Sequence, residues 1–519
     1  MLTSGVPSFR LEEYKPARNN KNDQDQATLY VAWCRSDVIK SSLAWVFRVK
    51  RSHGDYCYVS IAAGNWPVSL LSGYGVNRWL ILFFFQPWRT DLLRQLVGKL
   101  VDLREGSELK GLIIATFYGF FIMFSYYILR AVRDEISSAD RGNLQYLWTA
   151  VFFVMLLAVP AYSWLTSKFS RGVFVPLANR FFILCLVAFW ACLMFLPLEA
   201  RPWIDRIFYV WSSVFALFVV TVFWGFMSDC FDNDQGKRLF SFIAVGSSLG
   251  GMAGSAVTAG LAEVLPAFLL LLVACVPLEL ASWCAKALHR RFKTGSVVIS
   301  GEAERVIAGN ALSGMKAVFA SRYLMGIAAF IALMTFVSTM LYFQQASLIA
   351  DAFANRGERT AFYAKIDLLV SALTIVFQVY LTARIIKWLG VGFTLAIIPA
   401  LMALGFMLLG LYPTLAVLVV VQVIYRAGRY GLTKPAREIL WTVLGREAKY
   451  KSKPFLDAAV YRGGDLLSGW IYTGLAALGL SIGAIALTAA PVAGLWAMLA
   501  INLGNKQEKL SKKDLAESQ

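Results

Sequence analysis

Arginine residues stand inside long apolar segments of this chain, where a charged side chain is costly unless it faces protein or water. Arg426 lies about 17 Å from the start of its segment at Leu415, counted at 1.5 Å per helical residue, which is near the middle of a bilayer. Few acidic residues are expected within its reach. An always-charged guanidinium there is predicted to bind an anionic substrate, with a structural ion pair to Asp465 as the alternative.

A second group of polar residues lies at the outer end of the first long apolar segment. Tyr126, Arg130, Arg133 and Asp134 share one helical face by their spacing of four, seven and eight residues. The two arginines are candidate anion ligands, and Tyr126 and Tyr127 are candidates to stack on a planar group. The alternatives are gate salt bridges or snorkelling for the charged residues and interfacial anchoring for the tyrosines.

Two connections rich in both signs of charge, residues 229–238 and 434–453, follow the fourth and tenth apolar segments. Their equivalent positions predict a paired cytoplasmic gate of ion pairs that break when a cavity opens inward, with ordinary solvated loops as the alternative. The predicted gate residues are Asp229, Lys237, Arg238, Arg437 and Arg462.

Composition excludes several other kinds of chemistry. The 519 residues include only two histidines, and no G-x-x-x-x-G-K-[ST] phosphate loop occurs. The seven cysteines form no C-x-x-C motif, so neither a zinc site nor a disulfide framework is predicted. We therefore expect no enzyme activity, no metal and no cofactor.

The elements that must position these residues are membrane helices. The chain is 58% hydrophobic and 16% charged, where soluble proteins average roughly 25% charged. Apolar runs long enough to cross a bilayer recur along it. The prediction is an all-α polytopic membrane protein with about twelve transmembrane helices in two six-helix bundles. The expected spans are 111–132, 144–166, 181–200, 206–228, 239–262 and 266–286, then 323–349, 364–386, 391–411, 415–433, 456–479 and 481–503.

The division of the chain follows from these spans. Residues 91–286 and 323–505 form the two bundles, 287–322 a basic cytoplasmic linker and 506–519 a charged cytoplasmic tail. Residues 1–90 are expected to be either a poorly ordered extension or an artefact of the gene model. An offset of about 215 residues aligns Tyr127 with Tyr342 and Gly254 with Gly469, which indicates a duplicated half.

The net charge of +18 is distributed as in membrane proteins. Lysine and arginine gather in alternate connections, which predicts cytoplasmic termini and a bilayer partner, with no nucleic-acid binding. One helix, residues 239–262, carries Gly246, Gly250 and Gly254 at intervals of four. The stripe predicts close helix packing, either inside one bundle or as a sliding contact with the opposite bundle.

Three motifs occur in order. They are Tyr126-Tyr-Ile-Leu-Arg-Ala-Val-Arg-Asp-Glu135, then Phe223-Trp-Gly-Phe226 with Gln235-Gly-Lys-Arg-Leu-Phe-Ser-Phe-Ile243, then Pro435-Ala-Arg-Glu438 with Lys449-Tyr-Lys-Ser-Lys-Pro-Phe-Leu-Asp457 and Tyr461-Arg-Gly-Gly-Asp465. Over residues 95 to 503 the chain resembles the ATP/ADP translocase family of the major facilitator superfamily, and within it the uncharacterised relatives from free-living bacteria.

The resemblance implies a twelve-helix carrier that exchanges nucleotides without hydrolysing them, in a bacterial inner membrane. It also implies substrate contacts for Arg133, at the place of a family lysine, and for Lys453 or Lys451, at the place of another. Two acidic family positions hold Ser212 and Leu341 here. Loss of those carboxylates leaves the nature of the anion open.

The function expected from the sequence is secondary-active transport of a small organic anion, with nucleotides as one candidate, by a monomer that alternates access to the two sides. The alternative is a membrane scaffold or sensor that retains the transporter fold without transporting. The predicted substrate-binding residues are Arg426, Arg133, Arg130, Tyr126, Tyr127, Lys453, Lys451 and Asp465.

Overall fold

The computed structural model describes residues 10–13, 30–33, 43–51, 54–62, 106–168, 171–231, 233–294, 311–445, 448, 452–453 and 455–517. The chain divides into two compact units, Met1–Trp88 and Arg89–Gln519. This division lies beside the predicted boundary at residues 90 and 91. That residues 1–90 are either a poorly ordered extension or an artefact of the gene model stays a prediction.

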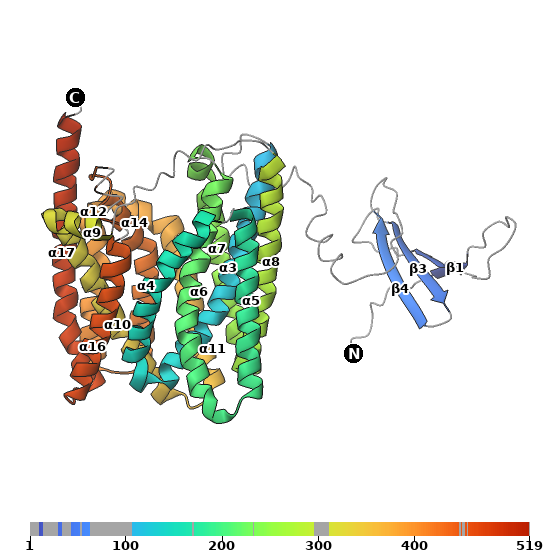
Figure 1. Ribbon diagram of the computed structural model, residues 1–519, viewed down its shortest axis with the longest axis horizontal. Coiled ribbons are helices and arrows are strands. Elements are labelled where there is room, and N and C mark those ends of the chain that lie inside the picture. Colours follow the sequence, from blue (N-terminus) through green and yellow to red (C-terminus); the bar gives the residue numbers. More distant parts are fainter. Residues whose placement is uncertain are drawn as a thin grey trace, which may run out of the picture. The chain divides into compact units, whose positions relative to one another are not determined.

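The first unit contains two antiparallel β-hairpins (Figure 1). Strand β1 (Arg10–Glu13) pairs with β2 (Tyr30–Trp33), and β3 (Leu43–Arg51) pairs with β4 (Gly54–Ala62). The sequence analysis did not anticipate these strands. The available signal was the richness of β3 and β4 in aromatic and β-branched residues, which favour strands.

The second unit is helical and matches the twelve predicted spans. Its N-terminal half consists of α3 (Gly106–Ala139), α4 (Leu144–Lys168), α5 (Arg171–Phe195), α6 (Arg201–Cys230), α7 (Asn233–Leu261) and α8 (Ala267–Thr294). Its C-terminal half consists of α10 (Arg322–Ala352), α11 (Arg356–Val376), α12 (Thr382–Leu411), α13 (Leu415–Gly428), α14 (Lys434–Ile439), α16 (Tyr461–Ala477) and α17 (Ile482–Glu517), preceded by the short α9 (Ala311–Ala320).

Ten segments of the described chain are long and apolar enough to cross a membrane. One of them, Arg356–Leu411, contains both α11 and α12, which accounts for two predicted spans. The chain turns inside it at Gly390, whose φ of 72° suits a residue without a side chain. Helix α16, with 17 residues, is not among the ten segments. The all-α polytopic prediction is therefore confirmed for this unit.

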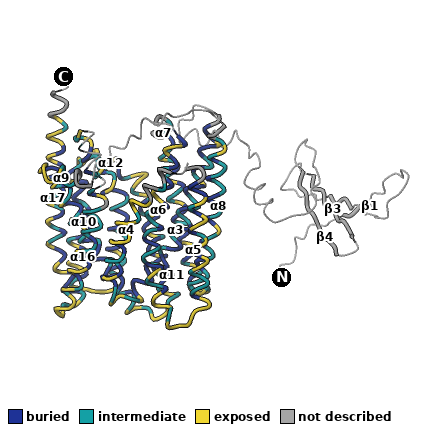
Figure 2. Tube along the Cα trace, viewed as in Figure 1, coloured by how far each residue is buried: buried dark blue, intermediate teal, exposed yellow. Residues whose placement is uncertain are grey.

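The helices begin and end at two opposite faces of the bundle (Figure 1). We call the face at which α3 begins and α17 ends the terminal face, and the other, which carries residues 140–143, 196–200 and 353–355, the distal face. Helix α11 packs against α3 and α7, and α16 against α4, so these pairs join the two halves. In the most apolar 18-residue stretch of each helix, 56% of the residues are buried in α10 but only 22% in α5. Figure 2 shows buried and exposed residues along the helices.

The glycine stripe of α7 packs inside the N-terminal half. A Cβ atom added to Gly246, Gly250 or Gly254 would meet Thr116, Phe120 or Phe124 of α3. The alternative of a sliding contact with the opposite bundle is therefore wrong. The corresponding Gly469 of α16 faces Phe343 of α10, so the aligned glycines occupy the same helix pairing in each half.

Replacing Gly250 with alanine is expected to destabilise the fold. Its Cβ would lie 2.1 Å from the carbonyl oxygen of Phe120, which the helix backbone holds in place, so α3 and α7 must separate. Overpacking of this kind costs about 1–3 kcal/mol. Thermal unfolding of the purified protein in detergent measures it. The control is Gly260→Ala in the same helix, where a Cβ meets nothing within 4 Å; equal unfolding midpoints for the two variants would contradict the packing argument.

Candidate functional site

A chain of ion pairs crosses the interface between the two halves. Arg426 of α13 contacts Asp367 of α11, with Nη2 2.5 Å from Oδ1. The other oxygen of Asp367 lies 3.5 Å from Nε of Arg130 on α3, which also lies 3.5 Å from Asp134. Asp134 in turn contacts Arg133 at 3.2 Å. Positive and negative side chains alternate along this series of ion pairs, and its carboxylates are almost fully buried.

Few acids were expected within reach of Arg426, and the one that contacts it directly is Asp367. The sequence placed Asp367 at the first turn of a span, where a charge can reach water. Helix α11 instead begins at Arg356, so Asp367 lies about 16 Å along it at 1.5 Å per residue. The predicted alternative pairing with Asp465 is not the one observed, since Asp465 contacts Arg462 at 3.6 Å.

Helix α3 also extends further than expected, to Ala139 rather than residue 132. Arg133 and Asp134 are therefore inside the helix rather than at its outer end. Asp134 accepts a hydrogen bond of 3.0 Å from the Tyr342 hydroxyl of α10, in the other half. The same hydroxyl lies 3.5 Å from Arg133 Nη2 and 3.3 Å from the Tyr209 hydroxyl. These hydrogen bonds connect α3, α6 and α10.

Arg429 is the residue that sequence reasoning missed. It is the first residue of the π-helical turn η4 (Arg429–Thr433), and its own backbone continues the helical course of α13. Its guanidinium donates to the hydroxyls of Ser338 and Tyr461 and lies over the rings of Tyr430 and Tyr461. Within the described ranges, no carboxylate lies within 4.0 Å of it. The available signal was its spacing of three residues from Arg426.

We call Arg130, Arg133, Arg426, Arg429 and Arg462, with Asp134, Asp367 and Asp465, the central cluster. Arg429 and Arg462 both lie over the ring of Tyr461, and Asp465 contacts Arg462 at 3.6 Å. Five arginines against three aspartates leave two positive charges in excess. An excess of positive charge between the helices of a membrane protein favours an anionic ligand.

The predicted tyrosines lie beside the cluster. The rings of Tyr126 and Tyr127 meet edge to face with their centroids 5.4 Å apart, and Arg130 lies 5.6 Å from the centroid of Tyr127. Tyr127 also packs on Gly251 of α7. Tyr126 and Tyr127 are both half-buried.

The predicted gate and lysine contacts lie near the terminal face. Arg238 pairs with Glu108 within the N-terminal half at 3.1 Å, and Arg437 pairs with Asp457 within the C-terminal half at 3.4 Å. Lys453 contacts Glu438 at 2.6 Å. Asp229 is exposed in the last turn of α6. Lys451 and the side chain of Lys237 lie outside the described residues, and the gate function stays a prediction.

The two positions that carry acids in the resembled family are apolar or weakly polar here. Ser212 is buried and donates its hydroxyl to the Tyr209 carbonyl oxygen at 2.9 Å. Leu341 is fully buried in the hydrophobic core. The carboxylates of the central cluster therefore come from other positions.

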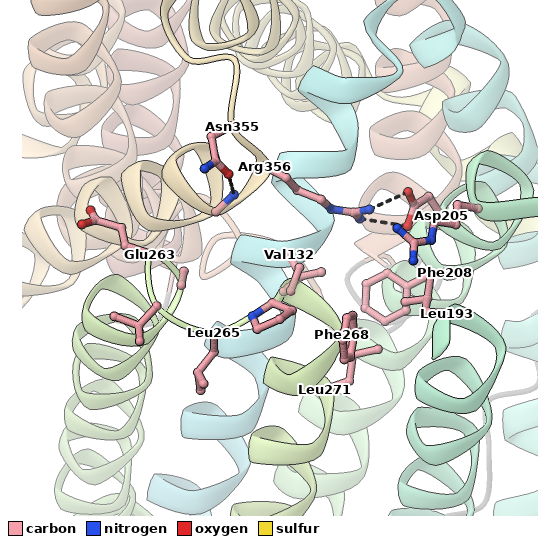
Figure 3. Close-up of a pocket in the computed structure, with 16 residues that line it drawn as sticks. Val132, Leu193, Asp205, Phe208, Glu263, Leu265, Phe268, Leu271, Asn355 and Arg356 are labelled. Atoms are coloured by element: carbon pink, nitrogen blue, oxygen red, sulfur yellow. Dashed lines mark hydrogen bonds and ion pairs between the residues drawn. The ribbon is translucent and has the colours of Figure 1, made fainter. Parts of the chain in front are cut away.

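The distal face holds a second set of ion pairs between the halves. Arg356 of α11 forms two hydrogen bonds of 2.9 Å with Asp205 of α6, as Figure 3 shows. The same arginine and Arg359 both contact Glu135 of α3 at 2.8 Å. A cavity of about 330 Å³ lies beside Arg356 and Asp205. Sequence reasoning did not assign these residues.

Exposed ion pairs also join the two halves at this face. Arg141 contacts Asp351 at 2.5 Å, and Lys365 contacts Glu263 at 2.8 Å, each across the two halves. Exposed ion pairs contribute little individually, because water screens them. The pairs of Arg356 and Arg359 differ from these exposed pairs because they include the buried carboxylate of Glu135.

No protein-family model and no curated protein sequence matches the chain. Solved structures do. The POT family transporter PepTSo gives a TM-score of 0.55 at 13% identity, over 77% of this chain and 98% of that one. A POT family transporter in complex with 5-aminolevulinic acid gives 0.55 at 13%, over 77% and 96%. A D-xylose-proton symporter gives 0.53 at 12%, over 77% and 97%.

Identities this low show the fold alone, so the resemblance to the ATP/ADP translocase family stays a prediction. The fold agrees with the helices and the two halves described above. The chain is a polytopic α-helical membrane protein with the major facilitator fold.

Proposed function

We propose that this protein is a secondary-active transporter of a small organic anion, and that the central cluster binds the anion between the two halves. The observation that carries the proposal is the excess of arginine over aspartate in the central cluster, whose aspartates are buried and whose arginines are buried or half-buried. A charged side chain inside a membrane protein is costly and typically marks a substrate or ion pathway.

Arg429 is the proposed primary anion ligand. Its partners are neutral hydroxyls and aromatic rings, so its charge is not cancelled by a contacting carboxylate. Arg133 is the second, since it shares Asp134 with Arg130 and keeps a side-chain exposure of 20%. Arg426 contacts the Asp367 carboxylate directly, and we assign it to holding α11 and α13 together.

Nucleotides are one candidate class of anion. Their phosphates would be matched by the forked donors of arginine, and their bases by the aromatic rings of Tyr126 and Tyr127. The motif resemblance supports the same class. The serine and leucine at the two acidic family positions argue for a different coupling from that family's.

The proposed cycle is alternating access. The ion pairs of the distal face close one entrance, and their rupture would open it while the terminal face closes. The distribution of lysine and arginine supports a cytoplasmic terminal face, with both termini inside and the protein in a bacterial inner membrane. We propose that it works as a monomer.

A ligand screen by thermal unfolding tests the binding step. Anionic compounds, with ATP and ADP among them, are expected to raise the unfolding midpoint, and neutral counterparts such as adenosine are not. A ligand at a hundred times its Kd stabilises the folded state by about 2.7 kcal/mol. No stabilisation by any anion would contradict the proposal and favour the non-transporting scaffold.

A further inference from the structure

The carboxylate of Glu135 is completely buried, and its two cationic partners belong to the opposite half. Its Oε2 lies 2.8 Å from Nε of Arg356, and its Oε1 lies 2.8 Å from Nη2 of Arg359. Glu135 belongs to α3, whereas both arginines belong to the first turn of α11. Any movement that parts the halves at the distal face must therefore separate this carboxylate from both positive charges.

The groups left around Glu135 after such a movement disfavour its negative charge. Asp205 of α6 is a second carboxylate, and its negative charge repels that of Glu135. Glu135 also sits in the last turns of α3, where the helix dipole is negative. Its neighbours on α3 include Asp134, which is paired with Arg130 and Arg133, and Ser137 and Ser138, whose hydroxyls bond that of Tyr363 on α11. A carboxylate without a cationic partner in such surroundings favours its protonated form.

We propose that Glu135 binds a proton when the distal face opens, and releases it when Arg356 and Arg359 return, so that the proton is the ion coupled to transport. The step is simple addition of H⁺ to the carboxylate, with no other bond formed or broken. A cavity of about 330 Å³ is lined by Arg356 and Asp205, so one partner of Glu135 already borders a space that water can enter. The inference rests on the proposed alternating-access function.

Distance measurements between spin labels test the proposal without any substrate. Labels on cysteines replacing Leu198 and Tyr412, both exposed at the distal face in different halves, report its opening in a background whose native cysteines are alanine. For the wild-type pair, the ratio of open to closed molecules is expected to rise as pH falls, by up to about tenfold per pH unit for one proton. Glu135→Gln, which mimics the protonated form, is expected to be open at every pH.

Two control variants distinguish the role of Glu135 from the roles of other carboxylates at the distal face. Glu263→Gln removes an exposed carboxylate from another pair that crosses the halves, and Asp205→Asn removes the second partner of Arg356. Both are expected to keep the pH response. A wild-type distance that does not change with pH, or a response that persists in Glu135→Gln, would overturn the inference. Because no anion takes part, this failure would leave the ligand screen unaffected, and a failed ligand screen would leave this result standing.

Discussion

Replacing Asp367 with asparagine is expected to destabilise the protein by about 3–5 kcal/mol, the usual cost of breaking a buried ion pair from one side. Asp367 is 1% exposed and contacts both Arg426 and Arg130. Without it, two guanidinium groups stay in a low-dielectric interior with Asp134 as their one remaining described carboxylate contact. Thermal unfolding in detergent measures the loss.

Two further variants make this result specific. Asp351→Asn removes an exposed acid whose pair with Arg141 also joins the halves, and it is expected to cost no more than about 1 kcal/mol. The double variant D367N/R426M removes both charges of the shortest contact and is expected to recover part of the stability lost in D367N. If D367N unfolds at the same temperature as D351N, the central cluster does not contribute to the fold as described.

Replacing Arg429 with glutamine is expected to weaken anion binding at least about thirtyfold, which corresponds to about 2 kcal/mol. The fold should be retained, because the partners of Arg429 are hydroxyls and aromatic rings that remain satisfied or tolerate the amide. Titration of the thermal stabilisation with the best anion of the screen gives the affinity.

Arg429→Lys keeps the charge without the planar fork, so its affinity is expected to fall between those of the wild type and of Arg429→Gln. The matched control is Arg180→Gln, which removes an arginine from an exposed pair with Glu279 on the outer helices. Equal affinities for the Arg429→Gln and Arg180→Gln proteins would remove Arg429 from the proposed site.

The sequence predicts the helices of this protein well, because bilayer-length apolar runs leave few other folds. Its errors lie where polar residues continue a helix. The sequence predicts connections at residues 356–363 and 133–139. In the structure, charged residues of the first segment pair with a charged residue of the second, across the two halves. Arg356 and Arg359 meet Glu135, so α11 and α3 extend through these segments as helices.

The central cluster could be predicted only in part for the same reason. Arg130, Arg133 and Asp134 follow from helical spacing within one segment. The contact of Arg426 with Asp367 joins two helices whose rotation about their axes is set by tertiary packing. The π-helical turn that begins at Arg429 has no local sequence signal that we can identify.

The proposed function requires flux of an anion through the interface between the halves. The most direct measurement is uptake of a labelled anion, chosen by the ligand screen, into proteoliposomes that contain the wild type or Arg429→Gln. We expect saturable uptake by the wild type that excess unlabelled anion suppresses, and a loss of at least about thirtyfold in the variant at low substrate concentration. Wild-type uptake no faster than that of empty liposomes, or equal uptake by the two proteins, would contradict it.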